Sequence, residues 1–484
     1  MSKEMVGPFK SSKWTVFDAR LSKKSIWMIS LHLLFFMATM LIGELDYSAR
    51  VSLFAFLSAM TFWVMTSLSA GFVAIMVIIG IVLFRAAEAT LLYESFAQEV
   101  VWLMIGAFII GEAVKQSGLG DRLIYYLLRK SRQKHTLLLF LTNLLLVSAF
   151  FIPSTSGRAA LTKPIISELG QRFHTNEERG FLALLAPVVI LMSTSATLIG
   201  AGSHLIGVGL LENTTDQSIS YIQWFIWAVP FTIAITFITF FIMKWFIWPS
   251  HSLTEVGKSI SINGHQMKPT TMTTKEKQTL RLIGLLLLAW LTEHVHGYDI
   301  GFITMAGALL FMLPRTGVIS WKEGINAISW QLIMFVAAAT ALGKTLVDTG
   351  VVGWIEGGLL DVLNVFDHIP NWLFMIIMLV IAVTSHLYVH SHTTRAIIFI
   401  PSIIVFSESI GLNTAAVVFL SLLGMNYCLT FPVSSKAILL FYEAGDMTID
   451  AKQLLQLSTI LMPVYILVMI VFYFTYWQWT GLQL

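Results

Sequence analysis

Long apolar stretches alternate with short polar segments along almost the whole chain. An α-helix needs about 20 apolar residues to cross a bilayer. Stretches near that length lie at about 24–43, 51–68, 69–85, 99–117, 180–211, 222–248, 279–297, 300–314, 327–349, 414–434 and 456–479. Two further apolar stretches, at about 137–170 and 371–408, are interrupted by polar residues. The pattern predicts an all-α polytopic membrane protein.

Composition agrees with a location in lipid. Of the 484 residues, 56% are hydrophobic and 12% are charged, whereas a soluble domain carries about 25% charged residues. The net charge of +3 is spread over the loops, so no nucleic-acid partner is expected. The sole cysteine, Cys428, excludes an internal disulfide. No loop carries an ATP-binding motif, so a primary pump is not expected either.

The two interrupted stretches contain the same polar phrase. It reads STSGRA at 154–159 and SHTTRA at 391–396, and a proline follows each at the same distance, Pro164 and Pro401. The two copies therefore keep one constant offset, close to half of the chain. Non-helical backbone at membrane depth is tolerated only where protein or a water-filled cavity satisfies its polar groups. Duplicated polar breaks of this kind are typical of the substrate sites of secondary transporters built from two repeats.

The distribution of Lys and Arg predicts the orientation of the chain. Six basic residues precede the first span and place the N-terminus in the cytoplasm: Lys3, Lys10, Lys13, Arg20, Lys23 and Lys24. The basic loops 119–136 and 249–281 then share the cytoplasmic side, and the loops without Lys or Arg face outward. This arrangement requires the first interrupted stretch to enter and leave from the cytoplasm and the second from outside. We therefore expect a multi-pass protein of the cytoplasmic membrane with two re-entrant hairpins in an inverted repeat.

The duplication divides the chain into four parts. A polar break also follows each hairpin, at 193–204 in one repeat and at 430–436 in the other. The linker between the repeats is polar and contains Pro, Gly and Ser. The expected parts are N-terminal scaffold helices (1–95), a first repeat (96–248) with its hairpin at about 137–170, a cytoplasmic linker (249–278), and a second repeat (279–484) with its hairpin at about 371–408.

The chemistry of the breaks favours an anion. Half-helix N-termini that meet inside the protein present free N–H groups and a positive dipole. Ser and Thr add hydroxyl donors, and an arginine adds a planar fork that matches a carboxylate or a tetrahedral oxyanion. The candidate substrate-binding residues are Ser154, Thr155, Ser156, Arg158, Ser391, His392, Thr393 and Arg395. The candidate ion-coupling or cavity-lining residues are Gly157, Thr197, Gly200, His204, Thr394, Pro432, Ser434, Ser435 and Lys436.

The two arginines allow more than one interpretation. Each side chain could simply extend to water from a shallow hairpin. A charge inside a span is costly and usually functional, however, and two charges stand at equivalent repeat positions. A sharper hypothesis is that each guanidinium takes the place of a sodium ion. It predicts a sodium-independent exchanger or a proton-coupled carrier.

Three histidines near the second phrase invite a comparison with metal sites. His386 and His390 lie one helical turn apart, and His392 follows. No cysteine or carboxylate joins them, so no metal site is expected. His392 is instead a candidate for a proton-sensitive contact, because imidazole can change charge near neutral pH. Lys436 is either an anion contact or a lysine that reaches the cytoplasmic surface.

At these residues the chain resembles the divalent anion:sodium symporter (DASS) family of dicarboxylate, citrate and sulfate carriers. The resemblance covers roughly residues 95–480. The phrases at 154–156 and 391–393 match the Ser-Asn-Thr motifs on that family's hairpin tips, with Thr155 and His392 in the places of the two asparagines. Residues 197–200 and 431–435 match the turns of its two broken helices, and Lys436 stands where an amide is expected.

The resemblance implies eleven transmembrane helices and two hairpins. It further implies a homodimer held together by scaffold domains, and a transport domain that moves as a rigid elevator. No cofactor is implied, and Na⁺ is a candidate coupling ion. The family's asparagine amides contact carboxylates or shape sodium loops, so their replacement leaves the substrate and the coupling ion open.

The sequence thus favours a secondary-active carrier of a small divalent anion, sulfate or a dicarboxylate, coupled to Na⁺ or H⁺ or acting as an exchanger. The combination of arginines and hydroxyls without amides leans slightly toward sulfate. A cation antiporter or metalloid exporter of the same superfamily is the alternative, but the breaks lack the buried acidic residues that it needs. A membrane-embedded, histidine-dependent enzyme would leave the duplication unexplained, so an enzyme is not expected.

Overall fold

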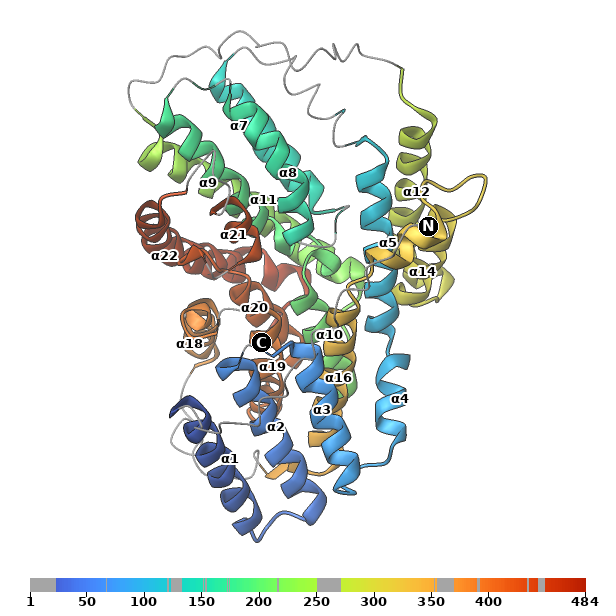
Figure 1. Cartoon of the computed structure of the whole chain (residues 1–484). Coiled ribbons are helices and arrows are strands. Elements are labelled where there is room, and N and C mark those ends of the chain that lie inside the picture. The colour runs from blue at the N-terminus through green and yellow to red at the C-terminus, as the bar shows by residue number, and fades with distance from the viewer. Residues whose placement is uncertain are drawn as a thin grey trace, which may run out of the picture.

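The computed structural model of the protein is built from α-helices and short 3₁₀ turns, with no β-strand among the residues that it describes (Figure 1). These residues are 23–484 without 67, 120–121, 123–132, 151, 153–154, 172, 174, 216, 250–270, 352, 355–369, 390–391, 433–434 and 443–448. Most of the predicted linker, 249–278, lies outside them. The all-α prediction is confirmed.

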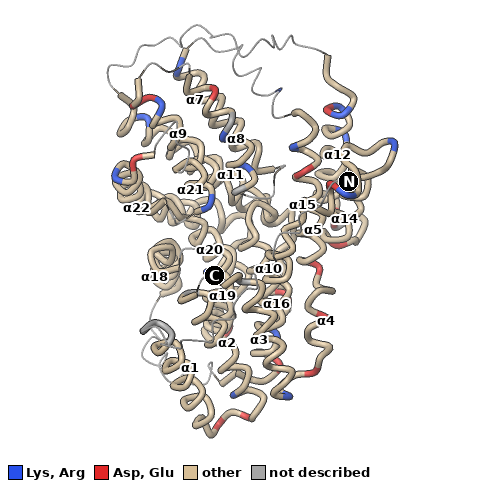
Figure 2. Tube along the Cα trace, in the orientation of Figure 1, with Lys and Arg blue, Asp and Glu red and all other residues tan. Residues whose placement is uncertain are grey.

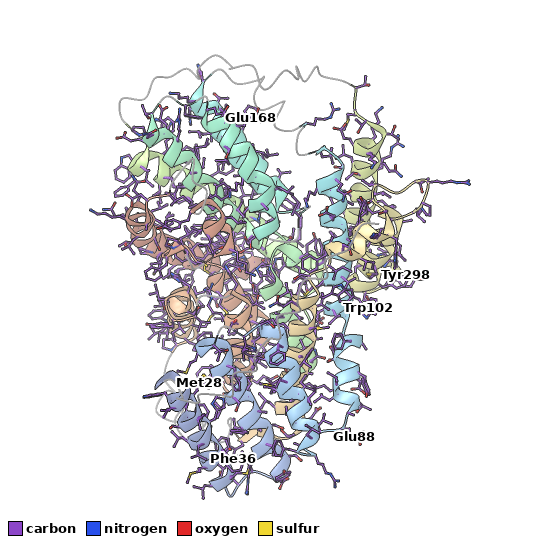
Figure 3. The ribbon with its side chains drawn as sticks, viewed as in Figure 1. Met28, Phe36, Glu88, Trp102, Glu168 and Tyr298 are labelled. Atoms are coloured by element: carbon purple, nitrogen blue, oxygen red, sulfur yellow. The ribbon has the colours of Figure 1, made fainter. Side chains whose placement is uncertain are left out.

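The N-terminal part forms a group of helices that packs on the second repeat. The helices are α1 (Lys23–Leu41), α2 (Tyr47–Met65), α3 (Ala70–Leu83) and α4 (Thr90–Ala97). They lie in the lower part of Figure 1, and α3 packs along α16. Apolar side chains are exposed on this group, such as Phe36 of α1 (labelled in Figure 3), which is 45% exposed. Such an outer surface suits contact with lipid.

The first repeat carries its hairpin and its broken helix in sequence order. Its elements are α5 (Glu99–Gln116), α7 (Lys134–Ser148), α8 (Thr155–Gly170), α9 (Asn176–Met192), the 3₁₀ turns η1 (Thr194–Ala196) and η2 (Leu198–Gly200), α10 (Gly202–Thr214) and α11 (Tyr221–Ile247). Polar caps define several of these starts. Thr175 accepts a hydrogen bond from the backbone of Glu178, and Ser220 and Gln223 form a capping box.

The second repeat follows the same plan after four additional helices. Its elements are α12 (Thr274–Leu291), α13 (Glu293–His296), α14 (Ile300–Phe311), α15 (Trp321–Ala327), α16 (Trp330–Asp348), α18 (Asn371–Thr384), η3 (Ser385–Leu387), α19 (His392–Ser409), α20 (Thr414–Met425), α21 (Lys436–Tyr442), α22 (Ala451–Thr475) and η5 (Trp477–Thr480). Helix α14 packs on α5, and α12 packs on α14, on the right of Figure 1.

The hairpins repeat with the offset seen in the sequence. The step along the chain from the start of α7 to the start of α18 equals the step from the start of α8 to the start of α19. Single hydrogen bonds repeat as well: the Ser148 hydroxyl donates to the Leu145 carbonyl, and the Ser385 hydroxyl donates to the Ala382 carbonyl, each at 2.6 Å. The duplication is therefore structural as well as sequential.

Each hairpin is closed at its base by a different interaction. In the first, Lys134 and Glu178 form a buried ion pair at 2.7 Å, and the Lys134 ammonium lies over the Phe173 ring. In the second, the rings of Phe374 and Phe406 stack 5.2 Å apart. Phe173 lies just after α8 and Phe406 near the end of α19, and each contacts the start of the other arm, so the arms are antiparallel. Glu178 ties the start of the first arm to α9.

The two repeats exchange their packing, in that each packs the second arm of its hairpin against a helix of the other repeat. The second arm of the first hairpin, α8, packs on α21 of the second repeat, and α19 of the second hairpin packs on α10 of the first. Both α10 and α21 are the helices that restart after a break. The tips of the hairpins are thereby brought to the breaks at the centre of the molecule.

Four described helices are long and apolar enough to cross a membrane: Asn176–Ala196, Tyr221–Ile247, Trp330–Asp348 and Ala451–Thr475. A bent pair, Thr90–Ala97 with Glu99–Gln116, meets the same test with a bend of 48°. Several shorter apolar helices accompany them, including α7, α14, α18 and α20. The number of eleven spans and the membrane side of each hairpin stay predictions.

The first break requires a glycine at position 200. A Cβ atom on Gly200 would lie 2.1 Å from the Thr194 carbonyl oxygen, inside van der Waals contact. That oxygen belongs to backbone and cannot rotate away. The close approach of η1 and η2 therefore depends on the missing side chain.

We expect Gly200→Ala to lower the free energy of unfolding by about 1–3 kcal/mol or more, because the break must open to admit the methyl group. Thermal unfolding in detergent measures the effect. Gly284→Ala is the matched control, since a Cβ there has no neighbour within 4 Å among the described residues. Equal melting temperatures for the two variants would contradict this account of the break.

Candidate functional site

Hydroxyl groups of the first break bond to the end of α9 and to the end of the first hairpin arm. Ser193, Thr194 and Thr197 are each at most 1% exposed. The Thr194 hydroxyl donates to the Ile190 carbonyl at 2.8 Å, and the Thr197 hydroxyl donates to the Ala149 carbonyl at 3.1 Å. These bonds satisfy helix-end carbonyls that lipid could not satisfy.

Arg158 joins three segments of the first repeat. Its guanidinium is 1% exposed and donates to the Leu145 carbonyl at 2.6 Å and to the Ile190 carbonyl at 3.1 Å. It also donates to the hydroxyls of Ser148 at 3.0 Å and Ser193 at 2.5 Å. The acceptors lie at the C-terminal ends of α7 and α9. The charge is thus surrounded by the negative ends of two helices.

Arg395 occupies the equivalent position and has fewer partners. Its Nη1 donates to the Tyr427 carbonyl at 3.2 Å, at the same spacing along the chain as Arg158 has to Ile190. The Cys428 thiol lies within hydrogen-bonding reach of the guanidinium. Its Nε and Nη2 atoms, although the residue is 0% exposed, have no hydrogen-bond partner among the described residues. The two arginines therefore occupy equivalent positions, but Arg395 has fewer hydrogen-bond partners within the protein than Arg158.

The starts of α10 and α19 meet beside Arg395. A Cβ atom placed on Gly202, the first residue of α10, would lie 4.0 Å from the Thr393 hydroxyl. Close by along the two helices, the hydroxyl of Ser203 and both ring nitrogens of His392 are buried without a partner among the described residues. Two helix N-termini with unpaired donors beside them form an environment that suits an anion.

Asn426 links the two breaks directly. It is the C-cap residue of α20 in the second repeat, and its amide Nδ2 donates to the Ser195 hydroxyl at 2.8 Å and to His204 Nε2 at 2.5 Å. His204 Nδ1 in turn lies 3.2 Å from the Thr197 carbonyl. Asn426 is not among the residues predicted from the sequence; its signal is a polar amide within the apolar stretch 414–434.

A second polar chain fixes the second break to α22. His386 donates from Nδ1 to the Val383 carbonyl, so its Nε2 accepts from the Thr430 hydroxyl at 2.6 Å. The Thr430 and Ser458 hydroxyls lie 2.7 Å apart, and Tyr427 donates to the Ser458 carbonyl at 3.0 Å. His386 is thus held by protein groups, in keeping with a lining role.

The other predicted residues have varied positions. Ser154, Ser391, Ser434 and His390 lie outside the described residues. On the first turns of α8 and α19, Thr155, Gly157 and Thr393 are partly buried and Thr394 is buried, and Ser156 belongs to the first turn of α8. At the second break Pro432 is partly buried, Ser435 is buried and accepts a hydrogen bond from the Ala437 backbone, and Lys436 is exposed.

Charge and metal ligands are sparse at this centre. Figure 2 shows most Lys, Arg, Asp and Glu positions near the ends and rim of the molecule and few in its middle. Among the described residues no group of three or more His, Cys, Asp or Glu could hold a metal ion. The buried arginines are therefore a dominant source of charge near the meeting point of the breaks.

A helical protein with paired hairpins and broken helices that meet at its centre belongs to the class of membrane transporters. The model of the sodium:sulfate symporter transmembrane region matches residues 23–483, and the chain belongs to this family. The family resemblance is thereby confirmed, and the protein is a transporter rather than an enzyme.

Characterised relatives and a solved structure agree with this membership. The chain is 24% identical to the citrate/succinate antiporter of Escherichia coli K12, over 77% of each chain. It is 22% identical to sodium-dependent high-affinity dicarboxylate transporter 3 of Caenorhabditis elegans, over 79% of this chain and 76% of the relative. The YdaH transporter of Alcanivorax borkumensis shares the fold, with a TM-score of 0.58, 12% identity, and coverage of 96% of this chain and all of the other.

We expect Arg158→Lys to lower the melting temperature by several degrees, because an ammonium cannot span the acceptors on α7 and α9 that the guanidinium joins. Breaking a buried, hydrogen-bonded charge is among the costlier substitutions. Arg315→Lys, at an exposed loop position, is the control. A melting temperature for Arg158→Lys equal to that of the control would show that the four hydrogen bonds contribute little.

Proposed function

We propose that this protein carries a small dicarboxylate dianion across the cytoplasmic membrane by exchange. The substrate binds where the starts of α10 and α19 meet, between the two breaks. Sulfate, toward which the sequence leaned, is the second candidate, since the family model is named for sodium:sulfate symport. The relatives named above favour dicarboxylates, because both carry citrate, succinate or dicarboxylate in their names.

The unpaired donors around Arg395 carry the assignment of an anion. Arg395 Nε and Nη2, the Ser203 hydroxyl and the His392 ring are buried without partners among the described residues. Buried donors left unpaired cost free energy, and a carboxylate accepts several of them at once. A cation antiporter is disfavoured, because the described residues of 193–204, 392–395 and 426–436 include no Asp or Glu.

The partners of Arg158 support exchange over sodium coupling. In transporters of this architecture, Na⁺ is held by carbonyls at the C-terminal ends of half-helices. Here the Leu145 and Ile190 carbonyls, in the last turns of α7 and α9, already accept hydrogen bonds from Arg158. A fixed guanidinium supplies positive charge at this place in every state of the carrier. Without a coupled ion the return step requires a substrate, which makes the carrier an exchanger.

The conformational change that we propose is the one that the family resemblance implies. A homodimer would hold its scaffold helices fixed while the hairpins and broken helices move as one body, in an elevator. The exchanged packing of α8 on α21 and α19 on α10 supports motion as a unit, because neither repeat can shift without the other.

For the coupling, we expect proteoliposomes loaded with succinate to take up labelled succinate equally well when external Na⁺ is replaced by choline. Empty liposomes should take up much less, since exchange needs a substrate inside. Protein-free liposomes are the background control. Uptake that collapses without Na⁺, or that proceeds equally into empty vesicles under a Na⁺ gradient, would sink the exchange proposal.

For the site, we expect Arg395→Lys to raise the KM for succinate by about tenfold or more, because one or two charge-assisted hydrogen bonds to the substrate are lost. Its melting temperature should fall less than that of Arg158→Lys, whose guanidinium has more protein partners. Uptake kinetics and thermal unfolding on the same preparations measure both quantities. An unchanged KM would place the substrate away from Arg395.

A further inference from the structure

The orientation of the Asn426 amide is fixed by its neighbours. A backbone carbonyl can only accept, so His204 carries its proton on Nδ1, which faces the Thr197 carbonyl. His204 Nε2 must then accept, and the amide atom 2.5 Å away must be the donating Nδ2. The reversed amide would place two acceptors against each other. Asn426 Oδ1 therefore points away from His204 and Ser195.

This oxygen is a buried acceptor without a partner. Asn426 is 2% exposed, and Oδ1 has no hydrogen-bond donor among the described residues. Unlike the unpaired groups of Arg395, it can only accept. A buried acceptor that stays unpaired destabilises the protein. A bound ligand that carries a hydrogen-bond donor would remove this cost.

Asn426 lies beside the candidate site. Asn426 precedes Tyr427, whose carbonyl accepts a hydrogen bond from Arg395 Nη1. Its amide bonds to His204, on the same first turn of α10 as the unpaired Ser203. The donors of Arg395 and Ser203 and the acceptor of Asn426 therefore belong to neighbouring residues between the repeats.

We infer that Asn426 Oδ1 accepts a hydrogen bond from a hydroxyl group of the substrate, so that the carrier prefers a 2-hydroxydicarboxylate to the unsubstituted dicarboxylate. The inference rests on the proposed function and names its substrate class more closely. Carboxylates and sulfate offer acceptors only, and an oxygen facing them would be repelled. A hydroxyl on the carbon chain supplies the missing donor while the carboxylates take the arginine, hydroxyl and helix N–H groups.

A substrate series on the wild-type protein tests the inference without any substitution. L-malate, 2-fluorosuccinate and succinate compete with labelled succinate for uptake into succinate-loaded proteoliposomes. Fluorine resembles the hydroxyl in size but cannot donate. We expect L-malate to inhibit at a concentration about tenfold lower than succinate, and 2-fluorosuccinate to behave like succinate. Equal inhibition by all three, or by L-malate and 2-fluorosuccinate alike, would overturn the role of the hydroxyl donor.

Asn426→Ala then tests the residue. We expect the ratio of inhibition by L-malate and succinate to fall from about ten to near one, whatever the loss of total uptake. Asn213→Ala is the matched control, because that amide bonds to Gln98 and Gly209 at the far end of α10, and its ratio should stay at the wild-type value. A ratio retained in Asn426→Ala would overturn the assignment to this residue.

The two proposals fail in different ways. Absence of any dicarboxylate uptake by the wild type would overturn the proposed function and this inference together. Uptake of succinate with no preference for L-malate would overturn this inference alone. Stronger inhibition by hydrogenphosphate than by L-malate would overturn the carbon-chain substrate, since that dianion also carries a hydroxyl.

Discussion

The structure depends on how backbone polar groups are satisfied where helices stop inside the apolar region. Lipid offers no hydrogen bonds there, so each interrupted helix needs partners within the protein. Arg158 meets much of this need in the first repeat, because one guanidinium binds the ends of α7 and α9 and two nearby hydroxyls. The hairpin tip, the break and the start of α10 all take their positions from those ends.

The second repeat has the same arrangement, but its arginine makes fewer hydrogen bonds within the protein. Arg395 makes one backbone bond of the same sequence spacing, and its Nε and Nη2 atoms stay open among the described residues. The second break is held instead by the chain from His386 through Thr430 to Ser458. Because other residues take over the structural task, the proposed function assigns Arg395 to the substrate. A duplicated fold can in this way assign support to one copy of a residue and recognition to the other.

The sequence predicted the helical class, the two hairpins and their offset, because apolar length and a repeated polar phrase are local signals. It also placed both arginines among the important residues. It could not distinguish them, since the difference lies in partners such as Leu145 and Ile190, whose backbone carbonyls have no signature in a sequence. Asn426 was missed for a related reason: its role comes from His204 and Ser195, which belong to the other repeat and are distant along the chain.

The exchanged packing of the repeats has a consequence for how the protein is made. Helix α8 is synthesised well before α21, the helix against which it packs, because more than half of the chain separates their starts. At a synthesis rate of about 5–20 residues per second, the ribosome needs on the order of tens of seconds to cover that distance. During this interval the first hairpin must persist in the membrane with a buried charge and no second repeat. The four hydrogen-bond partners of Arg158 all lie between residues 145 and 193, so the charge can be satisfied by chain that is already present, long before the transporter is complete.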